Sequence, residues 1–231
     1  EKEISRCHNI QWAKKISLNS AYGAIGNQYF RFYNVNQASA ITTAGQFIIQ
    51  YVEQQVNKYV NDILQTKDKI DYIVASDTDS IYLCLDKLVD KFCKDKTKEQ
   101  KLNFVDKVAK GKIEPFIEKC FEEVAGYTNA FQQKMVMKRE VIADKGIWTA
   151  KKRYMLNVLD EEGFRYEEPK LKIMGIEAVK SSTPEVCRTG IKEAIRLIMN
   201  KDEDALQNYI ADFKVKFHKF EPEQIAFPRS C

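Results

Sequence analysis

The stretch VASDTDSIYL, residues 74–83, sets two carboxylates, Asp77 and Asp79, between two apolar runs. The runs DYIVAS and SIYLCL have the aromatic and β-branched composition of strands, so residues 70–85 are predicted to form a β-hairpin with the acids at its turn. Residues i and i+2 of a strand face the same side, so the two side chains can converge. Two like charges at that spacing repel unless a cation lies between them. The hairpin therefore predicts a site for Mg²⁺, which is usually held by one or two carboxylates and substrate phosphates.

Three interpretations of the acid pair compete. An EF-hand loop also begins D-x-D, but it needs Gly at its sixth position and Glu at its twelfth, where this chain has Tyr82 and Leu88. A phosphatase of the haloacid-dehalogenase type places D-x-D after an apolar strand, yet usually on the first strand of a parallel α/β unit, whereas a hairpin strand follows here. The third interpretation is the catalytic hairpin of a polymerase palm. The hairpin alone does not choose between the last two.

Composition limits the remaining possibilities. The chain has 231 residues, of which 44% are hydrophobic, so it can bury a substantial core. It contains no apolar run long enough to span a membrane. Its six cysteines are scattered without a C-x-x-C pair and it has two histidines, which favours a reducing cytosol over a disulfide framework or a zinc site. Residues 134–153 hold seven basic and two acidic side chains, either a phosphate-binding patch or a solvated strand face.

Hydrophobic periodicity predicts a mixture of helices and antiparallel strands, which argues for an α+β fold. Asn36 is expected to cap the second helix, and Thr183 is expected to cap a later helix whose first residue is Pro184. The predicted helices cover about 3–25, 37–65, 86–93, 98–125, 184–199 and 203–217, and strands are expected at 134–143, 146–160 and 165–175 besides the hairpin.

The segment KKISLNSAYGAIGN, residues 14–27, adds a second signal. It places Lys15, Asn19 and Tyr22 at i, i+4 and i+7, which is one face of a helix. A cation, an amide and an aromatic ring on one stripe suit a nucleoside triphosphate, with the lysine at a phosphate. On spacing alone a solvated surface stripe is the better interpretation. Together with the D-T-D-S hairpin, the stripe becomes a much stronger indication of nucleotide chemistry.

The order of KKISLNSAYGAIGN, ASDTDSIYL and AKKRYMLNV resembles family B DNA polymerases. The flanking segments FRFYNVNQASAITTAGQ and LKIMGIEAVKSSTP look especially like the replicative enzymes of T-even-like phages. The resemblance implies an α+β fold with an antiparallel palm sheet and catalytic hairpin, flanked by a fingers helix and thumb helices. It divides the chain into fingers (1–27), palm (28–178, with the hairpin at 70–85 and the KKRY strand region at 146–159) and the start of a thumb (179–231).

The same resemblance implies nucleotidyl transfer from a dNTP to a primer 3′-hydroxyl with two Mg²⁺ ions. Asp79 matches a metal-binding aspartate, Asp77 its neighbour at the primer end, and Glu140 a palm acid near the metals. The remaining matches are to nucleotide-binding positions at Lys15, Asn19, Tyr22 and Gly23, and to DNA-binding positions at Lys151, Lys152, Arg153, Tyr154 and Lys172.

The implied partners are primer-template DNA and an amino-terminal polymerase portion. That portion would carry the proofreading exonuclease and the palm aspartate of a D-F-x-S-L-Y-P-S-like segment, which this sequence lacks. Without that aspartate the chain alone is expected to be inactive, as one half of a split polymerase or a truncated piece. A sliding clamp would bind segments beyond this sequence, and the setting would be the cytoplasm of an infected bacterium, without a membrane. Two alternatives stay open: a Mg²⁺-dependent phosphohydrolase with Asp77 as nucleophile, and a non-catalytic DNA-binding fragment.

Overall fold

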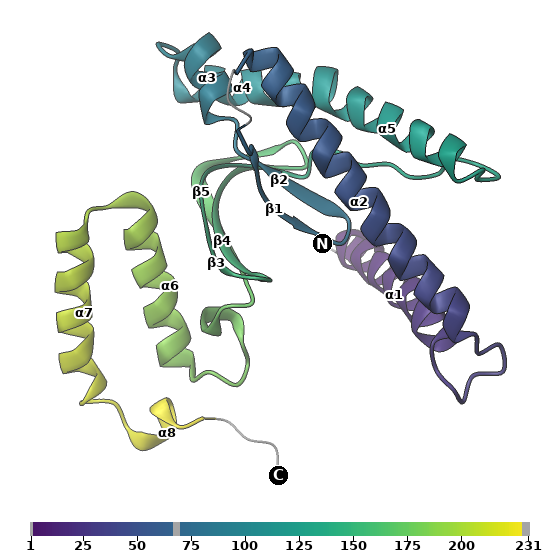
Figure 1. Cartoon of the computed structure of the whole chain (residues 1–231). Coiled ribbons are helices and arrows are strands. Elements are labelled where there is room, and N and C mark those ends of the chain that lie inside the picture. The colour runs from purple at the N-terminus through teal and green to yellow at the C-terminus, as the bar shows by residue number, and fades with distance from the viewer. Residues whose placement is uncertain (1, 67–69, 228–231) are drawn as a thin grey trace. The chain divides into compact units, whose positions relative to one another are not determined.

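The structure, a computed structural model, describes residues 2–66 and 70–227 (Figure 1). Glu1 and residues 228–231, the outermost residues of the fingers and thumb predictions, lie outside the described residues. The chain forms two compact units, a first unit within 1–87 and 115–137 and a second unit within 88–114 and 138–231. Helices and antiparallel strands occur in separate stretches, which confirms the α+β class. None of the described helices is both long enough and apolar enough to cross a membrane.

The first unit is built on a long helix, α2, at Val35–Leu64. It follows α1 (Lys2–Ile25) and precedes the hairpin strands β1 (Ile73–Asp77) and β2 (Ser80–Leu83). The cap of α2 is Asn34, whose side chain accepts a hydrogen bond from the backbone of Gln37, so the expectation of Asn36 as the cap was wrong. The helix buries one stripe of aliphatic side chains at intervals of four residues, which is the spacing of a single helical face: Val52, Val56, Val60 and Leu64.

Helix α5, Glu114–Tyr127, runs antiparallel to α2. At one end Tyr59 stacks on Phe116 with ring centroids 4.1 Å apart, and at the other end Phe47 stacks on Tyr127 at 6.1 Å. Between them, the Tyr51 hydroxyl donates to a carboxylate oxygen of Glu123 at 2.7 Å. These contacts fix α2, the helix on which the hairpin rests.

In the second unit, β3 (Val141–Ala150), β4 (Arg153–Glu161) and β5 (Phe164–Met174) form one antiparallel sheet in the order β3-β4-β5. A turn at residues 162–163 joins β4 to β5, and β5 lies within one residue of the strand predicted at 165–175. The strands predicted at 134–143 and 146–160 were wrong, because β3 begins later than expected and residues 146–160 do not form one strand. The chain reverses at residues 151–152, so KKRY spans a turn and the start of β4.

Helices precede and follow this sheet in the sequence. Helices α3 (Asp86–Cys93) and α4 (Lys98–Val108) come before it, and α4 continues through a π-helical turn, η1 (Ala109–Ile113), into α5. After it come a 3₁₀ turn, η2 (Glu177–Val179), then α6 (Glu185–Asn200), α7 (Glu203–Phe217) and the short α8 (Pro222–Ile225). Pro184 occupies the cap position of α6 with no side-chain hydrogen bond, so Thr183 is not its cap.

The second unit has its own hydrophobic core. Met155 of β4 packs with Ile195 and Met199 of α6, and Ile176 and Ala178 fill the space between them. The described strands form two sheets, a two-stranded hairpin and the three-stranded β3-β4-β5 sheet (Figure 1). Their union in one palm sheet therefore remains a proposal.

Candidate active site and DNA-contact surface

Asp77 and Asp79 lie at the tip of the β1–β2 hairpin. Asp77 pairs with Ser80 as the last rung of the ladder, which leaves Thr78 and Asp79 as a two-residue turn. The backbone φ of Thr78 is +44°, an uncommon value for a β-branched residue and a mark of local strain. Both aspartates are exposed to solvent. The turn thus presents two carboxylates outward at the end of an otherwise regular hairpin.

Hydrogen bonds between neighbouring residues of the turn hold Asp77. Its side-chain Oδ1 accepts from the Thr78 hydroxyl at 3.1 Å, and its carbonyl oxygen accepts from the Ser80 hydroxyl at 3.2 Å. The backbone N–H of Asp79 donates to the same carbonyl oxygen. These hydrogen bonds fix the backbone conformation of the turn. They therefore limit the directions in which the carboxylates of Asp77 and Asp79 can point.

Helix α2 supports the hairpin through side chains that the sequence reasoning missed. The side chain of Asn57 accepts from the backbone N–H of Tyr72 at 2.9 Å, and the amide of Asn61 both donates to and accepts from the backbone of Ile70. The Ser76 hydroxyl donates to Glu53 at 3.2 Å, next to the hairpin turn. These three polar residues, Glu53, Asn57 and Asn61, are spaced four apart and so lie on one face of the helix. This polar stripe on an otherwise apolar helix was the pattern in the sequence that could have predicted their contacts with the hairpin.

The hairpin fits a divalent cation as part of a larger site. Two exposed carboxylates are hard oxygen donors of the kind that Mg²⁺ prefers, and Mg²⁺ commonly takes its remaining ligands from water and phosphate. Within residues 2–66 and 70–227, no three acidic, histidine or cysteine side chains gather closely enough to hold a metal ion. Asp77 and Asp79 thus supply two donors, and the third acid predicted from the sequence, Glu140, belongs to the second unit.

The predicted nucleotide-binding residues, Lys15, Asn19, Tyr22 and Gly23, all lie on α1, as expected. Each is exposed, with 43% of the Tyr22 surface accessible. A methyl group at Gly23 would meet no atom within 4 Å, so nothing in the described chain requires glycine there. Glycine inside a helix costs about 1 kcal/mol relative to alanine. The contacts of the described residues therefore do not explain the glycine at position 23.

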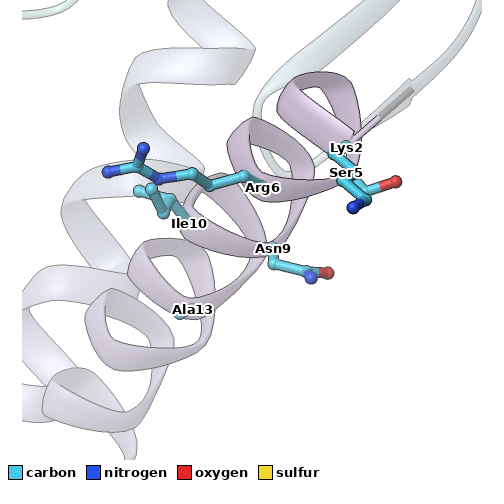
Figure 2. A pocket seen from close by; sticks show the side chains of 6 residues that line it. All are labelled: Lys2, Ser5, Arg6, Asn9, Ile10 and Ala13. Carbon is cyan, nitrogen blue, oxygen red and sulfur yellow. The ribbon is translucent and has the colours of Figure 1, made fainter.

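The first half of α1 borders an open depression, which Figure 2 shows with its lining side chains. All of these residues precede Lys15 in the helix, so the depression does not include the predicted nucleotide-binding stripe. Its lining comes from one helix face and provides no enclosed space for a ligand. The lining residues are Lys2, Ser5, Arg6, Asn9, Ile10 and Ala13.

Lys151 and Lys152 form the exposed turn between β3 and β4. Ala150 pairs with Arg153 across it, and Lys152 has a φ of +61°, in the left-handed region. Arg153 forms an ion pair with Glu177. Tyr154 is half-buried and stacks on Trp148 with centroids 6.1 Å apart. The side chains of Lys151 and Lys152 are therefore exposed at the end of the sheet. The contacts of Arg153 and Tyr154 fix the start of β4 next to them.

Lys172 and Glu140, predicted as a DNA contact and a metal-site acid, pair with each other. Lys172 Nζ lies 2.8 Å from Glu140 Oε1 and 3.5 Å from Glu161 Oε1. Burial favours the neutral amine of Lys172, but the carboxylates of Glu140 and Glu161 outweigh it and raise its pKa above the ordinary value. Each residue thus has an internal partner that a DNA or metal contact would have to replace.

Structural contacts engage part of the basic patch at 134–153. The side chain of Arg139 is 7% exposed and pairs with Asp106 and Asp160. Lys145 donates to the backbone carbonyl of Met199 at the end of α6. Lys134, Lys138, Lys151 and Lys152 are exposed members of the same patch.

The chain is similar to known proteins over most of its length. The model of DNA polymerase family B matches residues 1–227. The DNA-directed DNA polymerase of Enterobacteria phage T4 is 40% identical over 236 aligned positions, which cover 98% of this chain and 26% of the relative. That of Escherichia phage RB69 is 45% identical over 200 positions, covering 82% of this chain and 22% of the relative. The chain therefore spans about a quarter of the length of these curated relatives.

Proposed function

This chain belongs to DNA polymerase family B, and we propose that it is the portion of a DNA-directed DNA polymerase that carries the catalytic hairpin. The reaction is transfer of a nucleotide from a dNTP to the 3′-hydroxyl of a DNA primer. The observation that carries this proposal is the exposed hairpin tip, where Asp77 and Asp79 lie on a turn fixed by its own hydrogen bonds and by α2.

The two aspartates bind and orient the reacting groups. Two Mg²⁺ ions would favour attack by the primer hydroxyl and stabilise the charge on the triphosphate and departing pyrophosphate. Asp79 would be the principal metal ligand, and Asp77 would support the primer end of the site. Glu140, once released from Lys172, is the third acid that we assign to metal binding. An upstream aspartate outside this chain supplies the remaining carboxylate, because a single hairpin offers two.

The nucleotide and the DNA are held by different parts of the chain. On α1, Lys15 binds the phosphates of the incoming nucleotide, Asn19 lies beside it, and Tyr22 contacts the nascent base pair with Gly23 leaving room. On the second unit, Lys151 and Lys152 contact the primer-template backbone next to Arg153 and Tyr154, and Lys172 adds a phosphate contact after release from Glu140. In this scheme residues 1–27 are fingers, 28–178 palm and 179–231 the start of a thumb.

The partner is a polypeptide with the remaining polymerase segments. The described part of α1 buries no residue, and Ile4 and Leu18 are each 74% exposed, so this helix has an apolar surface for a neighbour. The relatives are about four times longer than this chain, so their additional segments could form the neighbour that covers α1. A sliding clamp would act through such further segments, and the assembly would work in the cytoplasm of an infected bacterium. The family match does not favour the phosphohydrolase alternative.

Co-expression with a polypeptide that carries the exonuclease, the first palm segment and the first fingers helix tests the proposal. The 231-residue chain alone should not extend a primer at any Mg²⁺ concentration. The co-purified complex should extend it in a template-dependent way. Robust templated synthesis by the single chain would contradict the incomplete site, and an inactive complex with correctly folded partners would contradict the polymerase assignment.

A further inference from the structure

Gly175, at the end of β5, lies directly against the Lys151–Lys152 turn. Its φ is +69°, and a Cβ atom added to it would lie 2.1 Å from the carbonyl oxygen of Lys152 and 3.2 Å from Cγ of Arg153. The nearest atom belongs to the backbone and cannot rotate away as a side chain would. Any residue other than glycine would therefore displace the turn or β5.

Glu177, two residues later, holds the other side of the same turn. Its carboxylate pairs with the Arg153 guanidinium and with Lys180, whose Nζ lies at 3.1 Å. Arg153 follows Lys152 immediately, so this ion pair limits where the turn can move. Gly175 thus lies against the backbone of Lys152, and Glu177 forms an ion pair with the next residue, Arg153.

The segment between and after these two residues is anchored in the core. Ile176 is 8% exposed and Ala178 is completely buried, and both pack with Met155 of β4 and Met199 of α6. A segment fixed at two buried positions cannot shift without disturbing α6. The position of the lysine turn is therefore coupled to the helix that begins the proposed thumb.

We propose that Gly175 and Glu177 are positioning residues, which hold the Lys151–Arg153 turn in the conformation that binds primer-template DNA. Neither residue contacts DNA itself. Gly175 acts through the backbone of Lys152 and Glu177 through the guanidinium of Arg153. This inference rests on the proposed DNA contact of Lys152.

The first test compares two glycines of the second unit. Gly163 also has a positive φ, +94°, but a Cβ atom there meets nothing within 4 Å, so Gly163→Ala carries backbone strain without the clash. Affinity of the 231-residue chain for a fluorescent primer-template is measured by anisotropy at low salt, with thermal unfolding in parallel. Gly175→Ala should weaken binding by roughly tenfold, the effect of losing a charged hydrogen bond, and Gly163→Ala should leave binding unchanged.

A double-mutant cycle with Lys152→Ala separates the two proposals. If Gly175 acts through Lys152, Gly175→Ala should add little to the effect of Lys152→Ala. Full additivity, or equal binding by Gly175→Ala and Gly163→Ala, would overturn the positioning role while leaving the DNA contact intact. Unchanged binding in Lys152→Ala, or no duplex binding by the unsubstituted chain, would overturn the DNA contact and the positioning role together.

Glu177→Gln gives an independent test should Gly175→Ala fail to fold. Loss of one negative charge would by itself strengthen binding to anionic DNA. A positioning role predicts weaker binding, partly restored in Glu177→Asp, with the KM for dNTP unchanged in the co-expressed complex. Equal or tighter DNA binding by Glu177→Gln would overturn the role of this residue.

Discussion

The guanidinium of Arg139 donates to Asp160, a β4 carboxylate with no solvent-exposed surface. Arg139 also pairs with Asp106 of α4, and its backbone N–H donates to Glu114 at 2.9 Å. The same Asp160 oxygen accepts from the backbone of Gly163 at 2.9 Å. One buried arginine therefore joins the sheet of the second unit to the helices that precede it.

Arg139→Met should destabilise the chain strongly, because it leaves Asp160 buried without its principal cation. Removal of one member of a buried pair costs about 3–5 kcal/mol. Urea denaturation measures the free energy of unfolding. Arg165→Met is the matched control, since Arg165 approaches Asp160 at 3.5 Å from a more exposed position, and its loss should cost below about 1 kcal/mol. Similar losses in the two variants would contradict the central role of Arg139.

Glu161 should make the chain sensitive to acid. Hydrogen bonds from Lys170 and Tyr166 lower the pKa of Glu161 to about 2. Because its folded pKa lies below the ordinary value, Glu161 adds stability above that ordinary value, and this stability is lost as the pH falls toward 2. Glu161→Gln should therefore flatten the decline in unfolding free energy over this range, whereas Glu167→Gln on β5 should not. An unchanged acid dependence in Glu161→Gln would count against these contacts.

Lys15 and Lys152 should separate nucleotide use from DNA binding. In the co-expressed complex, Lys15→Ala should raise the KM for dNTP, because a phosphate partner is lost. Lys152→Ala should instead weaken primer-template binding and extension from a mismatched end. Steady-state kinetics and gel shifts on the same preparations measure both effects, with the adjacent Lys14→Ala as control. If Lys15→Ala and Lys152→Ala changed only the DNA dissociation constant, the assignment of Lys15 would be wrong.

Local signals were sufficient to predict part of this fold. Apolar runs of aromatic and β-branched residues on both sides of Asp77 and Asp79 predicted the hairpin and its turn, because strand propensity is a property of neighbouring residues. The long helices were predicted for the same reason. The predicted helix caps differed from the observed ones by one or two residues, as for Asn34. Several polar side chains near the start of a helix can act as the cap.

The errors arose where distant residues determine the local structure. Lys151–Lys152 contains no residue typical of turns, and the left-handed φ of Lys152 occurs next to Gly175, which is remote in sequence. The support of the hairpin by Asn57 and the pairing of Lys172 with Glu140 likewise join separate segments. A single sequence gives no register for such contacts, so candidate site residues could be proposed from their motifs, whereas their partners could not.

The claim that Asp79 serves nucleotidyl transfer is tested by primer extension with the co-expressed complex that carries Asp79→Ala. Gel shifts on the same preparation measure DNA binding, and Asp95→Ala, at an exposed carboxylate of the second unit, is the control. We predict that Asp79→Ala abolishes extension while primer-template binding survives, because a metal-binding carboxylate is lost. Extension by Asp79→Ala within about tenfold of the unsubstituted complex would contradict the claim.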